Sequence, residues 1–156
     1  MISGIGKETA SYCPTEQVMN CPAGNETLFA ASKETKTLSM AVEVPGGQAL
    51  YVEPQTGAIG YTQAHSASEP EGAIHNAFVY TAPKDGEAFG YLDFKRDGKS
   101  RGFLACATSG DAEEGPWKIY ANLARVAFDE DACLGFTALA VTGPKKGKAF
   151  GAWQYE

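Results

Sequence analysis

Short stretches in which apolar and polar residues alternate recur along this chain. Residues 37–44 place Leu, Met and Val at every second position, with Thr, Ser, Ala and Glu between them. A period of two is that of a strand with one buried face. Comparable stretches follow at 48–53, 58–63, 77–81, 117–121, 135–141 and 149–155. Turn residues separate them, so the pattern predicts about nine short strands in an all-β fold, an antiparallel β-sandwich or a small barrel.

The clearest hairpin signal lies in residues 88–106. Apolar and polar residues alternate up to Lys95, polarity peaks around Asp97-Gly98, and apolar residues return at Phe103. Asp-Gly favours a tight turn because glycine adopts positive φ without a Cβ clash. We therefore predict a β-hairpin here, with Cys106 near its end.

An internal repeat links two parts of the chain. Residues 77–90 align without gaps to residues 138–151, and eight of the fourteen positions are identical. Each copy contains a strand, a Pro-Lys turn and Ala-Phe-Gly. Repeat folds need three or more copies, so two copies indicate similar scaffold hairpins that share their turn chemistry.

Composition and charge narrow the class of protein. The 156 residues are 44% hydrophobic and 21% charged, which is typical of a folded domain, and we predict one domain over residues 1–156. A net charge of −6 argues against binding nucleic acid, because phosphates attract a surplus of Lys and Arg. No apolar run approaches the ~20 residues that span a bilayer, so no membrane contact is expected.

The four cysteines indicate the compartment. Neither pair has CxxC spacing and the chain has two histidines, so a zinc site is not expected. Three disulfide pairings are possible. We favour Cys13–Cys21 and Cys106–Cys133 because the first pair lies far from the second in sequence. Disulfides would place the protein outside the cytosol; four buried thiols in a cytosolic domain are the alternative.

One modification site follows from secretion. Asn25-Glu26-Thr27 is an Asn-x-Ser/Thr sequon, although such tripeptides also arise by chance. We predict glycosylation of Asn25 on condition that the chain is secreted. Met1 and the residues after it lack the charged and apolar regions of a signal peptide. We therefore interpret Met1 as a start residue placed before a mature secreted chain.

Two polar stretches are the candidate binding loops. The first, residues 64–75, contains His65 and Ser66 and ends at His75. The second, residues 107–115, is acidic and precedes Trp117. Two histidines around a polar loop are more typical of a plain surface than of a metal site, so neither a metal nor a cofactor is expected.

No sequence motif identifies a reaction. Glu53 and Asp93 stand on predicted strands, but a glycosidase needs two carboxyls facing each other, which a sequence does not show. The strands are also rich in aromatic residues. A row of Trp and Tyr on one face would stack sugar rings and bind polysaccharide, whereas the alternative is that these rings fill the core.

Several strings resemble those of a known family. They are Tyr12–Pro14, Cys21-Pro22, Val44–Gln48, Gly60–Ser66, Phe103–Cys106, Pro116-Trp117 and Gly151–Tyr155. From about residue 11 onward the chain resembles the IgE-binding, PhiA-like cell-wall proteins of filamentous fungi. The resemblance implies secretion, association with the fungal wall, allergenicity in some members and elicitation of plant defence in others. It supplies no catalytic residue.

These observations combine into one functional expectation. We expect a secreted, non-enzymatic fungal protein that contacts wall polysaccharide or a host extracellular protein through its surface. A small hydrolase acting on wall glycans is the alternative. We expect the protein to be a monomer.

Overall fold

The computed structural model describes residues 10–22, 27–108, 116–140 and 151–156. Three features considered above lie outside these residues. They are the sequon residue Asn25, residues 109–115 of the second candidate loop, and residues 141–150 of the second repeat copy.

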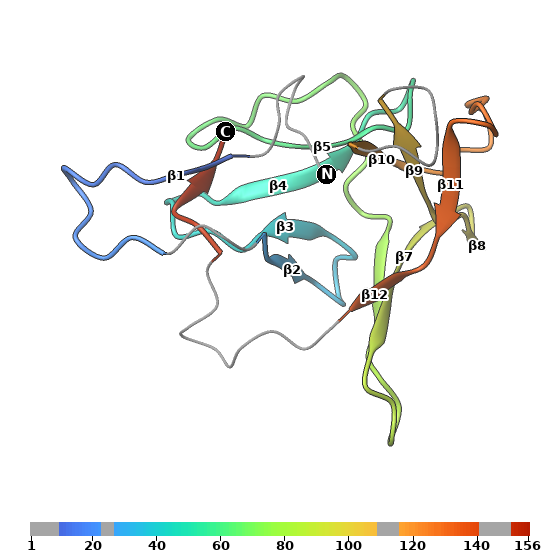
Figure 1. Cartoon of the computed structure of the whole chain (residues 1–156), viewed down its shortest axis with the longest axis horizontal. Coiled ribbons are helices and arrows are strands. Elements are labelled where there is room, and N and C mark those ends of the chain that lie inside the picture. The colour runs from blue at the N-terminus through green and yellow to red at the C-terminus, as the bar shows by residue number, and fades with distance from the viewer. Residues whose placement is uncertain (1–9, 23–26, 109–115, 141–150) are drawn as a thin grey trace.

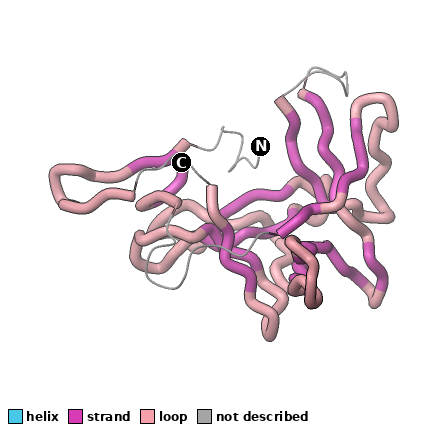
Figure 2. Tube along the Cα trace, turned by 60° about the horizontal axis from the view of Figure 1, so that its bottom comes forward, coloured by secondary structure: helices cyan, strands magenta, loops and turns pink. Residues whose placement is uncertain are grey.

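The described residues form strands and loops. The strands are β1 (Ser11–Tyr12), β2 (Phe29–Ala31), β3 (Leu38–Met40), β4 (Gln48–Val52), β5 (Ile59–Tyr61), β6 (Phe78–Thr81), β7 (Gly90–Arg96), β8 (Lys99–Ser100), β9 (Phe103–Ala107), β10 (Trp117–Ala121), β11 (Cys133–Phe136), β12 (Ala138–Ala140) and β13 (Gln154–Tyr155). The described parts of the chain contain no helix, and so none that could cross a membrane (Figure 2). The all-β prediction is confirmed.

The strands form four antiparallel sheets (Figure 1). Their orders are β2-β3-β4-β5, β12-β7-β6 with β8 added to β7, β10-β9-β11, and β1-β13. Each sheet has edge strands, so the predicted small barrel is wrong: the sheets do not close. An isolated bridge between Ala58 and Tyr120 joins β5 to β10. The sequence predicted about nine strands; the structure adds strands of two or three residues, such as β2, that are too short to show a period.

One hydrophobic core lies where the sheets meet. Leu50 and Val52 of β4, Phe78 of β6 and Phe94 of β7 are fully buried in it. Phe78 and Phe94 stand opposite each other in the β6–β7 pair and pack edge to face, with ring centroids 6.1 Å apart. The C-terminal residues also enter this core, through Ala152 and Tyr155.

The predicted hairpin is correct at its turn and wrong in its return strand. Asp97 and Gly98 have φ of 53° and 70°, and Arg96 pairs with Lys99 across them. Both central residues thus adopt the left-handed conformation of a two-residue hairpin turn. The return strand β8 ends at Ser100, and β9 leaves β7 to pair with β10 and β11. Gly102, at φ 68°, redirects the chain so that Phe103 enters the core.

The first strands of both repeat copies flank β7. Strand β6 pairs with one edge of β7, and β12 pairs with the other. The hairpin of β6 and β7 extends away from the other sheets at the bottom of Figure 1. The prediction of one strand over residues 135–141 is wrong. Its residues are divided between β11, on the β9 sheet, and β12, on the β7 sheet.

Both predicted disulfides are present. Cys13 is bonded to Cys21, and Cys106 is bonded to Cys133. The second bond joins directly opposite residues of β9 and β11, whose Cα atoms lie 4.0 Å apart. It therefore staples two neighbouring strands of one sheet.

Candidate functional site

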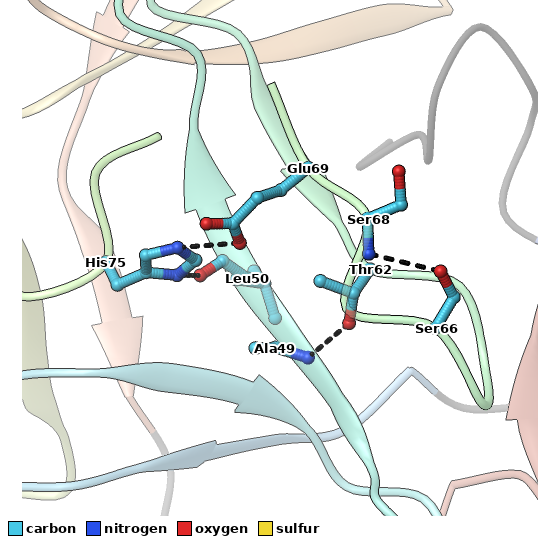
Figure 3. Close-up of polar contacts among 7 residues, drawn as sticks. All are labelled: Ala49, Leu50, Thr62, Ser66, Ser68, Glu69 and His75. Atoms are coloured by element: carbon cyan, nitrogen blue, oxygen red, sulfur yellow. Dashed lines mark hydrogen bonds and ion pairs between the residues drawn. The ribbon is translucent and has the colours of Figure 1, made fainter. Parts of the chain in front are cut away.

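The first candidate loop is held to β4 by a histidine. His75 Nε2 lies 2.9 Å from Glu69 Oε2, and its Nδ1 lies 3.1 Å from the carbonyl oxygen of Leu50 (Figure 3). A carbonyl only accepts, so Nδ1 carries the hydrogen. The ring donates to both acceptors when both nitrogens are protonated. Because His75 and Glu69 are each about one-third exposed, their contact holds the loop with modest strength.

His65 and Ser66 do not join this contact. His65 is exposed at a turn, where its φ is 60°. Ser66 Oγ accepts a hydrogen bond from the Ser68 N–H at 3.1 Å and so stabilises the turn (Figure 3). Both nitrogens of His75 face Glu69 and Leu50, so the two histidines do not form a metal-binding pair. No group of three or more metal-ligating side chains occurs among the described residues.

Two tyrosines lie near the end of β4. Burial raises the pKa of the Tyr51 phenol, and the carboxylates of Glu53 and Glu69 and the phenol of Tyr61 raise it further. Burial also raises the pKa of Tyr120, and Glu53 is again the second cause. Both phenols are therefore neutral near neutral pH. They can donate hydrogen bonds but do not serve as bases.

Trp117 lies on a different sheet from the first candidate loop. It begins β10 opposite Ala107 and is 37% exposed. Alternation along the three strands places an entirely apolar set of side chains on its side of the sheet: Phe103, Ala105, Ala107, Trp117, Ile119, Ala121, Leu134 and Phe136. Phe103 and Ala121 are buried in the core, whereas Trp117, Leu134 and Phe136 are exposed. We call this the Trp117 face. The structure therefore does not gather the four predicted binding residues into one site.

A second surface lies on the outward side of β7, and its residues were not among the predicted binding residues. Odd-numbered positions of β7 point away from the core, because Leu92 and Phe94 point into it. Paired positions extend this surface, which we call the β7 face: Val79, Thr81, Tyr91, Asp93, Lys95, Ser100 and Leu139. The alternation of Tyr91 and Asp93 was visible in the sequence, but the side on which the core lies was not.

The β7 face combines an aromatic ring with polar groups. Tyr91 is 42% exposed and stands between Thr81 and Leu139 on the neighbouring strands. Two residues along β7, Asp93 accepts a hydrogen bond from Ser100 Oγ at 2.7 Å through its Oδ2 atom. Lys95 Nζ lies 4.0 Å from the same oxygen. The surface thus offers a flat apolar ring beside a fixed carboxylate.

Nearly the whole sequence also matches a known family. A family model described as PhiA-like secreted protein matches residues 3–156. The chain belongs to the PhiA-like secreted protein family. A relative from Arthroderma benhamiae, named only as an uncharacterized secreted protein, is 34% identical over 154 residues, which cover 97% of this chain and 72% of the relative. No solved structure matches the chain.

Family membership confirms two of the expectations drawn from the sequence, the family itself and secretion. The resemblance noted in the sequence is confirmed, and so is secretion, because the family and its Arthroderma relative are secreted proteins. This PhiA-like chain is a secreted fungal protein with two disulfide bonds.

Proposed function

We propose that this PhiA-like protein acts outside the cell by binding an uncharged wall polysaccharide through its β7 face, without catalysing a reaction. The observation that carries the proposal is the exposed ring of Tyr91 beside the carboxylate of Asp93. Such binding would account for the wall association that the family resemblance implies. Allergenicity and elicitation of defence remain expectations from that resemblance.

The chemistry of a sugar ring fits this surface. A pyranose has a flat side of C–H groups and a rim of hydroxyls. The C–H groups pack against an aromatic face, and the hydroxyls donate to a carboxylate. Among the described residues, Ser100 and Lys95 both contact Oδ2 of Asp93, which leaves Oδ1 for a sugar hydroxyl. A neutral polymer is also not repelled by a chain of net charge −6.

One observation favours hydrolysis as a second candidate. The carboxylates of Glu53 and Glu69 both raise the pKa of the Tyr51 phenol, so these two acids lie near the same side chain. Each has another partner: Thr56 Oγ1 donates to Glu53 at 2.5 Å, and His75 contacts Glu69. If these acids were catalytic, the wild-type protein would release soluble sugars from β-glucan or chitin, and Glu53→Gln and Glu69→Gln would each abolish the release.

Co-sedimentation with insoluble chitin and insoluble β-glucan tests the binding proposal. We expect the folded protein to be retained by at least one polymer and Tyr91→Ala to bind about tenfold more weakly, because a stacked ring contributes on the order of 1 kcal/mol beyond its buried area. Tyr12→Ala is the matched control, since Tyr12 is 47% exposed on another strand. Equal retention of both variants, or no retention of the wild type, would contradict the proposal.

A further inference from the structure

The side chains of Glu69 and His75 meet across a tight turn of the first candidate loop. The Ala73 N–H donates to the Pro70 carbonyl at 3.1 Å, and the two side chains come from either side of this turn. Glu69 Oε2 and His75 Nε2 lie 2.9 Å apart (Figure 3). Their contact therefore holds the turn closed.

The chain is held more firmly after this turn than before it. After the turn, Ile74 is buried, its N–H donates to the Val52 carbonyl at 3.0 Å, and the Val52 N–H donates back at 2.9 Å. Before the turn, residues 65–69 are exposed, and the hydrogen bonds of their backbone N–H groups join positions at most three apart. The Glu69 carboxylate ties this segment to His75 and, through the His75 ring, to β4.

The His75 ring makes this contact sensitive to protonation. Its Nδ1 lies 3.1 Å from the carbonyl oxygen of Leu50, which only accepts, so Nδ1 keeps a hydrogen. A neutral imidazole has one hydrogen, so Nε2 would then present a lone pair to the Glu69 carboxylate. A positive ring has a hydrogen on each nitrogen and donates to both acceptors. Proton uptake by His75 and closure of the contact therefore favour each other.

The described titratable groups around His75 are neutral or negative. The ring of Tyr51 packs edge to face on the His75 ring, with centroids 6.3 Å apart. Burial raises the pKa of the Tyr51 phenol, and Glu53, Glu69 and Tyr61 raise it further, so this phenol is neutral near neutral pH. Among the described residues, no lysine or arginine forms an ion pair with Glu53 or Glu69. Histidine is the side chain that ordinarily changes its charge between about pH 5 and pH 8.

We propose that the Glu69–His75 contact is a pH-dependent switch, which holds residues 65–69 close to β4 in acidic surroundings and releases them as the external pH rises. The released loop keeps the Ile74 bridge and the Nδ1 hydrogen bond, so the change is local. Because the protein is secreted, the loop meets the external pH, and the exposed side chains of His65 and Ser66 change position with it. The proposal is independent of polysaccharide binding, because it uses no residue of the β7 face.

Nuclear magnetic resonance of the folded, disulfide-bonded protein between about pH 5 and pH 8 tests the switch. We expect the exchange protection of the Ala73 N–H, corrected for the intrinsic exchange rate, to fall roughly two- to fivefold as the pH rises, because contacts between partly exposed charges are weak. The protection of the Ile74 N–H, which is bonded to Val52, should not change. The ring nitrogen shifts of His75 should show two hydrogens at the acidic end and a hydrogen on Nδ1 alone at the other.

Glu69→Ala and Glu71→Ala form a matched pair of variants. Each removes an exposed carboxylate from the same loop, but Glu71 forms no ion pair with any described residue. We expect Glu69→Ala to show the lower protection of the Ala73 N–H at both ends of the pH range, and Glu71→Ala to respond to pH as the wild type does. Protection that does not depend on pH in the wild type, a neutral His75 ring with its hydrogen on Nε2, or equal responses of the two variants would each overturn the proposal.

Discussion

The side-chain amide of Gln48 pairs with the backbone of Tyr155, a residue 107 positions later in the chain. Gln48 Oε1 accepts from the Tyr155 N–H at 2.7 Å, and Nε2 donates to the Tyr155 carbonyl at 2.9 Å. Nε2 also donates to the carbonyl of Thr62 at 2.9 Å. Gln48 is fully buried, so its amide substitutes for a strand backbone inside the core.

Replacing this amide should destabilise the protein. Gln48→Leu has similar volume but leaves the buried backbone groups of Tyr155 and Thr62 without their partner, and we expect a loss of about 2–4 kcal/mol in the free energy of unfolding. Denaturant unfolding measures it. The control is Gln154→Leu, in which the lost hydrogen bond to Glu156 is exposed and the expected change is within about 0.5 kcal/mol. Equal effects of the two substitutions would contradict this role for Gln48.

The two disulfides should contribute unequally to stability. Cys106 and Cys133 are separated by 27 positions, and Cys13 and Cys21 by 8. A longer closed loop removes more conformational entropy from the unfolded chain, so we expect losses of roughly 3–4 kcal/mol and roughly 2.5 kcal/mol. Paired Cys→Ala variants compared in denaturant would show this order. The reverse order would mean that strain or residual structure, rather than loop entropy, dominates.

Gly60 should tolerate no side chain. It lies opposite Tyr51 in the β4–β5 pair, and an added Cβ would lie 2.8 Å from the Tyr51 ring. Because both residues are buried, we expect Gly60→Ala to lower the free energy of unfolding by about 1–3 kcal/mol. Gly135→Ala, on an exposed strand, should change stability much less. An unchanged unfolding midpoint for Gly60→Ala would show that the ring moves freely.

Stability at alkaline pH should depend on Glu53. The raised pKa values of Tyr51 and Tyr120 mean that their stabilising contribution is complete below pH 10.0, the ordinary tyrosine value, and is lost as the pH rises through the folded-state pKa values. Glu53→Gln should lower the pKa of both phenols, whereas Glu69→Gln should lower only that of Tyr51. Ultraviolet titration of tyrosinate, with Tyr51→Phe and Tyr120→Phe to assign the two signals, measures both shifts. Identical titrations in the two glutamine variants would refute the assignment.

Local chemistry made part of this structure predictable. Asp97-Gly98 forms the tight turn that its residue types predict. The alternation in residues 37–44 predicted a strand at the position of β3, although the observed strand spans only Leu38–Met40. The separation of the cysteines along the chain was enough to favour the observed pairing. The turn and the strand are determined by neighbouring residues, and the disulfides required a choice among only three possible pairings.

Long-range packing explains what was not predicted. The pattern of residues 135–141 reads as one strand, yet Phe136 and Ala138 belong to different sheets. Strand β2 is exposed throughout and therefore shows no burial period. Tyr91 could equally have pointed into the core, since the outward side of β7 is fixed by the packing of Leu92 and Phe94 into the core.

Because Ala152 and Tyr155 lie in the core, part of the core forms only late in the synthesis of the chain. Tyr155 pairs through its strand with the exposed strand β1 and through its backbone with Gln48, so residues at the C-terminal end of the described chain complete a core that begins at Leu38. During synthesis these last contacts form only after residue 155 has left the ribosome. Until then the side-chain amide of Gln48 lacks the backbone of Tyr155 as its partner, so this part of the core closes last.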